Sequence, residues 1–387
     1  MKPFLLRFVA CLFVVVSSSS HAAYTFTSFA GLGDLKGGPF DSYAFAVNNE
    51  GAVAGYGRTI AGREAFIFEN GSITGLGYIS GAPSPAESLA FDIATDGTII
   101  GSSATPYGSD LNGEAFKYQN GVMTGLGDLS GGLFFSQAEG ISADASVIVG
   151  TSISTNGYEA FSYQNGVMSG IGDLSGGLFL SQAFAVSNDN STIVGSSASG
   201  NGTEAFSYHT GSMVGLGDLA GGAFNSVAHA VSGDGSSIVG WGESVGGTEA
   251  FIYRNGTMTG LGDLDGGIFS SYAYDISADG SIIVGSSAGG ASGQEAVLWD
   301  ADSLAMLTVQ SELLLSAINV TADGWSELDQ VLGISDDGLT IVGRGIHNGN
   351  SEAWIATIAA TQVPIPTTAW LFGSALAGLL VIRRRNY

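Results

Sequence analysis

Cysteine and basic residues are scarce in this sequence, and both shortages exclude kinds of function. Cys11 is the only cysteine, and it lies in an N-terminal stretch that we expect to be removed. The mature chain would then have no disulfides, thiolate nucleophiles or cysteine-based zinc sites. Of the 11 Lys and Arg residues, five lie at the two ends, so the body combines 6 basic with all 35 acidic residues, a net charge of −29. Such a body repels phosphate backbones, so we expect no nucleic-acid partner.

Motifs for catalysis are also missing from the sequence. No Ser/His/Asp spacing, phosphate-binding loop or paired-histidine metal motif is visible. We therefore expect no catalytic residues and no required cofactor. The acidity of the body is interpreted as a solvated surface, although it could also attract divalent cations.

Glycine, in contrast, is abundant and periodic. The chain has 61 glycines, and a Gly-Leu-Gly-Asp-Leu stretch recurs, with an isoleucine in one copy and a degenerate second copy. The last four copies are spaced by 45 residues. A fixed period of this length indicates a repeat architecture. The copies begin at Gly31, Gly75, Gly125, Gly170, Gly215 and Gly260.

Each repeat is predicted to form four short strands. In the fifth copy we expect them at residues 227–232, 236–241, 249–253 and 257–262. An Asp-Gly turn separates the first two strands, and an Asn-Gly hairpin separates the last two. The Gly-Leu-Gly-Asp-Leu stretch then ends the fourth strand and carries the chain into the next unit. Four hairpin-linked strands in about 45 residues are typical of a propeller blade.

The second strand of the repeat occurs seven times, which predicts a seven-bladed β-propeller. The seventh unit lacks a fourth strand, whereas residues 24–29 have no unit before them. We therefore expect this N-terminal strand to complete the last blade and close the ring. Between Gly285 and Gly343 the spacing grows to 58 residues. We expect residues 310–318 within this insertion to form a short amphipathic helix on the ring, with Trp325 anchoring its return.

Both ends of the chain have the composition of targeting segments. Residues 1–22 combine a basic start, an apolar stretch and small residues at the end, which predicts a secretory signal cleaved between Ala22 and Ala23. An uncleaved membrane anchor is the alternative. At the other end, residues 359–366 form a linker, and an apolar run precedes three arginines. This pattern predicts a transmembrane helix with a basic tail over residues 367–387, with the body outside the cell.

The C-terminal pattern resembles the PEP-CTERM sorting signal of Gram-negative bacteria. Ile365 stands where that signal usually has Glu, so the match is to a Val-Pro-x-Pro variant. The resemblance implies an exosortase-type processing enzyme as a partner, and a surface or exported protein from an organism that makes extracellular polysaccharide. A plain membrane anchor is the alternative. The matching residues are Val363, Pro364, Ile365, Pro366, the run Ala369-Trp370-Leu371-Phe372-Gly373-Ser374, Arg383, Arg384 and Arg385.

The repeat itself resembles the HAF family of extracellular repeats. The resemblance rests on Ala228-His229-Ala230-Val231-Ser232, Asp279-Gly280, Ile283-Val284-Gly285 and Glu249-Ala250-Phe251. It covers roughly residues 30–358 and implies a secreted repeat protein, without implying any particular chemistry. Residues 23–358 are thus expected to form one HAF-repeat propeller.

Acidic residues recur at three repeat positions. The aspartates are interpreted as capping tight turns, with calcium binding as the alternative. The glutamates are expected to be structural and to accept hydrogen bonds from neighbouring blades. One aspartate series is Asp34, Asp128, Asp173, Asp218 and Asp263, and the other is Asp96, Asp144, Asp189, Asp234, Asp279 and Asp337. The glutamates are Glu64, Glu114, Glu159, Glu204, Glu249, Glu295 and Glu352.

A few polar residues break the repeat and are therefore candidates for a specific role. They occupy different repeat positions, so no common site is indicated. His229 replaces Phe184 and is expected to pack within a strand, and His209 is expected to be exposed in a hairpin. The residues are Glu139, Tyr158, His209, His229, Arg254, Arg344 and His347.

We thus expect an exported, non-enzymatic protein at the cell surface or in the extracellular matrix. Its role would be scaffolding or binding, toward polysaccharide or other surface proteins. The alternatives are a propeller enzyme acting on glycans, since fold does not determine function, and a calcium-stabilised structural module. Several unique polar residues converging at one mouth of the channel would favour the enzyme.

Overall fold

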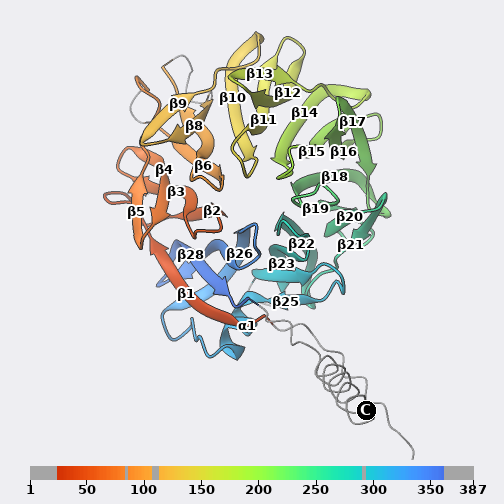
Figure 1. Ribbon diagram of the computed structural model, residues 1–387. Helices are drawn as coiled ribbons and strands as arrows, with labels where there is room; N and C mark the ends of the chain where they lie inside the picture. The colour runs from red at the N-terminus through yellow and green to blue at the C-terminus, as the bar shows by residue number, and fades with distance from the viewer. Residues whose placement is uncertain (1–23, 83–85, 107–112, 290–292, 361–387) are drawn as a thin grey trace, which may run out of the picture.

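The computed structural model describes residues 24–82, 86–106, 113–289 and 293–360. Within these ranges the chain forms 28 strands and one short helix, with the strands grouped in fours around a central axis (Figure 1). In each group the first strand lies innermost and contacts the first strands of both neighbours, all the way around the ring. The predicted all-β propeller is thus confirmed.

The first three blades follow the chain in order, and each is an antiparallel meander. Blade 1 contains β2 (Tyr43–Val47), β3 (Val53–Thr59), β4 (Gly62–Glu69) and β5 (Ser72–Gly75). Blade 2 contains β6 (Ser88–Ile93), β7 (Ile99–Ala104), β8 (Gly113–Gln119) and β9 (Val122–Gly125). Blade 3 contains β10 (Gly131–Ile141), β11 (Val147–Ser154), β12 (Gly157–Gln164) and β13 (Val167–Gly170).

Blades 4 to 6 continue the same pattern. Blade 4 contains β14 (Gly176–Val186), β15 (Thr192–Ser199), β16 (Thr203–His209) and β17 (Ser212–Gly217). Blade 5 contains β18 (Gly221–Val231), β19 (Ser237–Ser244), β20 (Thr248–Arg254) and β21 (Thr257–Gly260). Blade 6 contains β22 (Gly266–Ile276), β23 (Ile282–Gly289), β24 (Gly293–Asp300) and β25 (Met306–Thr308). Single parallel bridges join blades 3 to 6 into one 16-stranded sheet.

The seventh blade is built from both ends of the described chain. It contains β26 (Trp325–Ile334), β27 (Thr340–His347) and β28 (Asn350–Ile358), and its outer strand is β1 (Phe26–Gly33). β1 pairs antiparallel with β28, from Phe26 opposite Ile358 to Gly33 opposite Ala353. The predicted closure of the ring by the N-terminal strand is confirmed.

The innermost strand of blades 3 to 6 is longer than predicted. We expected the strand of blade 5 at residues 227–232, but β18 starts at Gly221. Gly221 pairs with Ser244, and the next pair is Ser226 with Gly242, so the residues between them bulge out beside the hairpin that joins β19 and β20. The strand therefore begins on one face of the ring and carries side chains out onto that face.

The core consists of clusters between adjacent blades. The aromatic residue that follows the repeated alanine of the third strand is fully buried in six blades, as Phe66, Phe116, Phe161, Phe206, Phe251 and Trp354. Blade 6 has Val297 at that position, and the fully buried Trp299 lies two residues later. Each large aromatic side chain removes a large apolar area from water, so the blade contacts hold the ring together.

The insertion in the seventh unit contains the predicted helix. α1 (Val309–Leu315) begins one residue before the expected range and ends three residues before its end. Val309 and Leu313 are buried in the same core cluster as Trp325, as expected for an amphipathic helix packed on the ring.

The predicted signal cleavage at Ala22 and Ala23 lies outside the described residues. The predicted sorting motif, transmembrane helix and arginine tail also lie outside them. Among the helices of the described ranges, none is long and apolar enough to cross a membrane.

Candidate functional site

The repeated glutamate explains the first glycine of the Gly-Leu-Gly-Asp-Leu stretch. In blade 4, Glu204 accepts a hydrogen bond from the backbone N–H of Gly217 at 3.1 Å. A Cβ on Gly215 would overlap the Glu204 carboxylate, so only glycine leaves room for this contact. Gly217 has a φ of +81°, which favours glycine for a second reason. The stretch is therefore a structural step between blades, not a ligand loop.

The structural role predicted for the glutamates is correct, but the predicted partner is wrong. In the first five blades the donor N–H lies 13 residues later, at or just after the end of the fourth strand of the same blade, and not in a neighbouring blade. In the seventh blade the donor does not follow the glutamate in sequence: Glu352 accepts the N–H of Gly33 in β1 at 3.0 Å. This contact is part of the ring closure.

The aspartate of the same stretch does more than cap its own turn. Asp218 accepts the N–H of Leu219 and, through its other oxygen, the N–H of Asn225, both at 2.8 Å. Asn225 lies in β18, so the carboxylate ties the linker to the next blade. Asp34 makes the equivalent contacts to Leu35 and Asp41.

A buried serine in the first strand joins neighbouring blades and was not predicted. Ser226 donates to the Gly217 carbonyl at 2.6 Å and accepts the Ala205 N–H at 3.0 Å, both from blade 4. Blade 7 has Asp329 at the equivalent position, directly before the residue that pairs with Arg344. The serine is polar within a strand that alternates small and polar residues, so its sequence gives little sign of this role. The other serines are Ser42, Ser88, Ser136, Ser181 and Ser271.

The Asp-Gly turns between first and second strands confirm the turn interpretation of the second aspartate series. Asp234 accepts the Ser232 hydroxyl and the Ser236 N–H, both at 2.9 Å. These bonds, with those from Ser236 the strongest, lower the pKa of Asp234. Within the described ranges, no group of three or more His, Cys, Asp or Glu side chains is arranged to hold a metal ion.

Asp234→Ala is expected to lower the free energy of unfolding by about 1 kcal/mol, because it removes two turn hydrogen bonds. Chelation with EDTA is expected to leave the melting temperature unchanged. Asp265→Ala is the matched control for Asp234→Ala, because Asp265 is exposed and directly follows the last copy of the Gly-Leu-Gly-Asp-Leu stretch. A drop in melting temperature on chelation would instead support the calcium-stabilised module.

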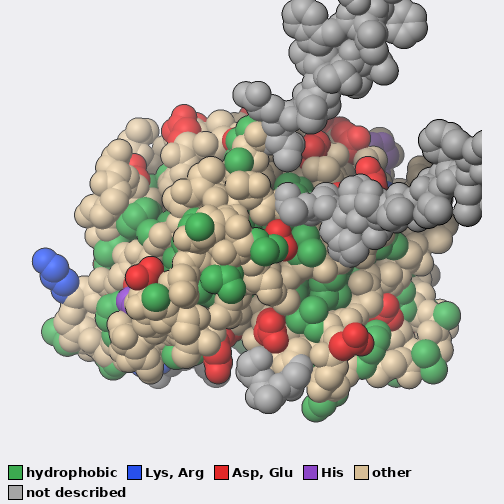
Figure 2. Space-filling view, turned by 90° about the horizontal axis from the view of Figure 1, so that it is seen from below, with side chains coloured by type: hydrophobic (Ala, Val, Ile, Leu, Met, Phe, Trp, Pro, Cys, Tyr) green, Lys and Arg blue, Asp and Glu red, His purple; other side chains and the backbone are tan. Residues whose placement is uncertain are grey.

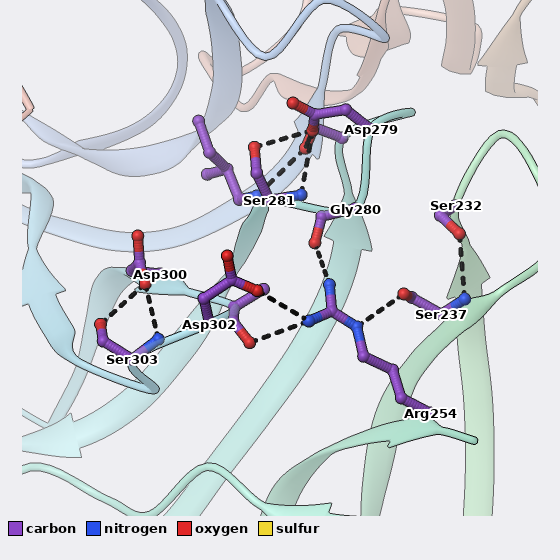
Figure 3. A network of polar contacts seen from close by, with 12 residues as sticks. Ser232, Ser237, Arg254, Asp279, Gly280, Ser281, Asp300, Asp302 and Ser303 are labelled. Carbon is purple, nitrogen blue, oxygen red and sulfur yellow. Dashed lines mark hydrogen bonds and ion pairs between the residues drawn. The ribbon is translucent and has the colours of Figure 1, made fainter. Parts of the chain in front are cut away.

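Arg254 breaks the repeat in order to join two blades. Its guanidinium lies between the second strand of blade 5 and the loops of blade 6 (Figure 3). Nε donates to the Ser237 hydroxyl at 2.7 Å, and Nη1 lies 3.3 Å from the Asp302 carboxylate. Nη2 donates to the Gly280 carbonyl. These contacts account for Arg254 as a structural residue.

Two other unique residues have local partners. His209, at the end of β16, places Nδ1 2.7 Å from the Ser191 carbonyl and is exposed, as predicted. Tyr158 packs edge-on against Phe135 at 5.8 Å. Neither residue lies in a group with the other unique residues.

The central channel brings two unique residues to one repeat position. Glu139 and His229 are both the unpaired residue at the bulge in the innermost strand, so our expectation that the unique residues occupy different repeat positions is wrong for this pair. His229 packs between Phe184 at 5.3 Å and Tyr274 at 6.0 Å, and Trp241 Nε1 donates to its Nε2 at 3.1 Å. The full set at this position is Phe45, Phe91, Glu139, Phe184, His229, Tyr274 and Leu332.

Burial in this narrow channel shifts the titratable groups toward their neutral forms. It raises the pKa of Glu139 to about 7 and lowers the pKa of His229 to about 4. Desolvation disfavours the charged form in both cases. Around pH 7 the channel therefore carries less charge than its residue types suggest.

One end of the channel holds a cavity of about 100 Å³ that contains unpredicted acidic residues. Asp92 and Asp275 stand where other copies have Ala or Gly, which is their only sequence signal. Each accepts two backbone N–H groups, one from the next blade, yet burial raises the pKa of each carboxyl to about 7. Asp336 also lines the cavity and accepts the Asn188 amide at 2.9 Å. These contacts order the channel lining.

His347 reinforces the closure of the ring. Its Nδ1 contacts Glu352, its Nε2 lies 2.9 Å from the Asp323 carbonyl, and its ring stacks on Trp325 at 4.7 Å. Burial alone would lower the pKa of His347, but the hydrogen bonds to Glu352 and Asp323 outweigh it and raise the pKa. Since Glu352 also holds Gly33, the charge on His347 is linked to β1.

Because the folded pKa of His347 lies above its unfolded value of about 6.5, its stabilising effect is complete below that pH. The effect is lost as the pH rises through the folded pKa. We expect the difference in melting temperature between the native protein and His347→Gln to shrink between pH 6 and pH 9. A difference that stays constant over this range would contradict the contact with Glu352.

Searches with protein-family models and of curated protein sequences found no match to this chain. Solved structures do resemble it. TolB from Acinetobacter baumannii matches with a TM-score of 0.43 and 15% identity, over 68% of this chain and 62% of that chain. An oligogalacturonate lyase from Vibrio parahaemolyticus matches with a TM-score of 0.49 and 11% identity, over 86% of this chain and 97% of that chain.

A structure of prolyl endopeptidases matches with a TM-score of 0.51 and 10% identity, over 84% of this chain and 51% of that chain. At this identity the similarity concerns the fold alone. The matches therefore do not decide whether this chain is catalytic. The prolyl endopeptidase match, with a TM-score above 0.5, agrees with the fold seen in the strand topology.

Proposed function

We propose that this chain is an exported, non-catalytic binding protein that acts at the cell surface or in the extracellular matrix. The observation that carries the proposal is a set of exposed apolar side chains on one face of the ring. This face, here called the hairpin face, is where second and third strands turn and innermost strands begin. Its exposed residues are Phe40, Ile60, Leu133, Leu178, Val245 and Ile268.

The repeat itself places these side chains on the surface. Gly131, Gly176 and Gly266 pair with the hairpin ends, and the residues after them bulge outward. Leu133 is 70% exposed, and the equivalent Leu178 and Ile268 are more than 80% exposed. Apolar side chains that several blades expose on one face offer contact area to a partner. Meanwhile the recurring Asp and Glu side chains are engaged in backbone hydrogen bonds, which supports a scaffold with no repeated catalytic site.

The binding role is tested by co-sedimentation of the full-length protein with extracellular polysaccharide and surface extract from the producing organism. We expect retention that weakens in the triple variant Leu133→Ser, Leu178→Ser, Ile268→Ser. Val122→Ser with Val167→Ser is the control, because these valines are about 60% exposed on outer strands instead. No retention of the native protein by any fraction would overturn the proposal.

The export route follows from the resemblance of the ends to targeting signals. We propose that a signal peptidase cuts after Ala22 and that an exosortase-type enzyme reads Val363 to Pro366. Replacing Arg383, Arg384 and Arg385 with Asn should then leave the protein uncleaved in the membrane fraction. Unchanged release from the cells would remove the sorting-signal part of this proposal.

One observation favours a glycan-acting enzyme as the second candidate. A carboxyl with a pKa near 7, as at Glu139, suits a general acid. The other channel carboxylates, Asp92 and Asp275, are already held by backbone N–H groups. Release of reducing ends by the native protein, absent in Glu139→Gln, would establish the enzyme in place of the binding protein.

A further inference from the structure

The few basic residues of the body are concentrated in one place. Three of the six lie in blade 1 or blade 7, toward the hairpin face, and a fourth, Lys36, lies in the link between these blades. We call Lys36, Arg58, Arg63 and Arg344 the basic patch. Elsewhere acidic side chains prevail: on the side seen in Figure 2 they are spread across the surface, whereas the few basic ones visible lie toward its left edge. Because the body has a net charge of −29, this separation of basic from acidic residues gives the basic patch a different electrostatic potential from the rest of the surface.

Two members of the basic patch are placed where they repel each other. Arg58 in β3 pairs directly with Arg63 in β4. Like charges directly opposite each other on adjacent strands are destabilising. No other blade has two like charges at this pair of positions; blade 3, for example, has Ile153 and Tyr158. Arg58 pairs with Asp41 at 3.1 Å, and within the described ranges Arg63 has no ion pair.

A stack of two tyrosine rings holds the guanidinium groups of Arg63 and Arg344, one at each end of the stack. Arg63 lies over the Tyr56 ring at 5.5 Å, and Tyr56 stacks on Tyr43 at 4.8 Å with an interplanar angle of 15°. Arg344 lies over the other side of this pair, 5.1 Å from the Tyr43 ring. The stack therefore runs from blade 1 across its seam with blade 7, the blade in which the ring closes, and it pre-orients both arginines.

The polar atoms around the stack are incompletely satisfied. Nε of Arg63, Nε of Arg344 and Oδ1 of Asp329 are buried without a hydrogen-bond partner. Arg344 is held by Asp329 at 2.9 Å, and Asp329 replaces the serine that joins blades elsewhere. The seam thus departs from the repeat at several positions at once, and each departure adds charge.

We propose that the basic patch binds a carboxylated polysaccharide, built from uronic acid residues. The inference rests on the binding role proposed above and names its ligand class. Planar guanidinium groups match carboxylates in two-pronged hydrogen bonds. Phe40, 42% exposed and adjacent to Asp41 in sequence, offers an aromatic face on which a sugar ring can pack. The surrounding acidic surface disfavours polyanions of high charge density, which leaves a polymer with one carboxylate per sugar.

The test measures binding of the full-length native protein and Arg63→Gln to alginate, a polyuronate, at low and high salt. We expect Arg63→Gln to bind about tenfold more weakly, since it loses a charge-assisted contact. Affinity of the native protein should fall with added salt. The melting temperature of Arg63→Gln should stay equal or rise, because the repulsion from Arg58 is relieved. A purely structural arginine would show the opposite pattern, with lower stability.

Lys117→Gln is the matched control, since it removes one positive charge in blade 2, beside Asp96. It should bind alginate as the native protein does. Equal binding of Arg63→Gln, or equally tight binding of poly-glutamate, would overturn the polyuronate assignment. Binding of neutral dextran but not of alginate would overturn this inference alone, whereas failure to bind any polysaccharide or surface fraction would overturn the proposed function as well.

Discussion

Removal of residues 24–33 is expected to abolish cooperative folding of the ring. β1 is the outer strand of blade 7, and its Phe26 and Leu32 are 3% and 6% exposed. Losing two such side chains from a core costs about 5–10 kcal/mol together, comparable with a typical total stability of about 5–15 kcal/mol. The deletion also removes the N–H of Gly33 from Glu352. Thermal unfolding followed by circular dichroism should show a broad transition or none.

A rearranged chain separates the missing strand from general damage. In this variant, residues 26–33 follow Ile358 through an Asn-Gly turn, the connection that joins β20 to β21. Since Ile358 already pairs with Phe26, the strand should dock in its native register and restore a cooperative transition. Thr27→Ala, on the exposed side of β1, should leave the stability nearly unchanged. A deletion variant that melts like the native protein would refute the closure by β1.

Gly240→Ala is expected to destabilise the protein by about 3 kcal/mol or more. Gly240 lies in β19, opposite the bulge of the innermost strand. It pairs with Ala228, and the next pair is Ala230 with Val239. A Cβ on Gly240 would overlap the backbone carbonyl of Val227, which cannot move without breaking the strand pairing. The same overlap recurs at Gly55, Gly101, Gly150, Gly195, Gly285 and Gly343.

Gly113→Ala is the matched control for this substitution. Gly113 also lies in a strand, but the nearest atom to its added Cβ would be 3.6 Å away, an ordinary contact. Denaturant unfolding should therefore show a lower midpoint for Gly240→Ala and an unchanged or higher one for Gly113→Ala. Equal effects of both substitutions would mean that strand propensity, not close approach, selects these glycines.

The period of the sequence was enough to predict the blades, the closing strand and the helix of the insertion. Each of these depends on the order and spacing of elements along the chain. The partners of side chains were predicted less well, because they depend on strand register. Glu204 was expected to reach another blade, yet the hairpin between β16 and β17 returns Gly217 to its side.

Residues that matter through departures from the repeat were the hardest to predict. Four residues around a hairpin turn separate Arg58 from Arg63, and only the register of the hairpin shows that they face each other. Asp92 and Asp275 converge on one cavity from blades 2 and 6, about 180 residues apart in the chain. Glu139 and His229 share a position that becomes clear once the bulged strands are aligned by their pairing.

The pairing of β1 with β28 also sets an order of events during folding. Phe26 is among the first described residues to be synthesised, and its partner Ile358 is among the last. Contacts this distant in sequence form slowly, because a long loop must close before they stabilise the chain. Until then the blade contacts can form, but the last blade presents an unpaired strand edge. The ring thus stays open until its final strands have been synthesised. Completion of the seventh blade then covers the unpaired strand edge through which the chain could aggregate.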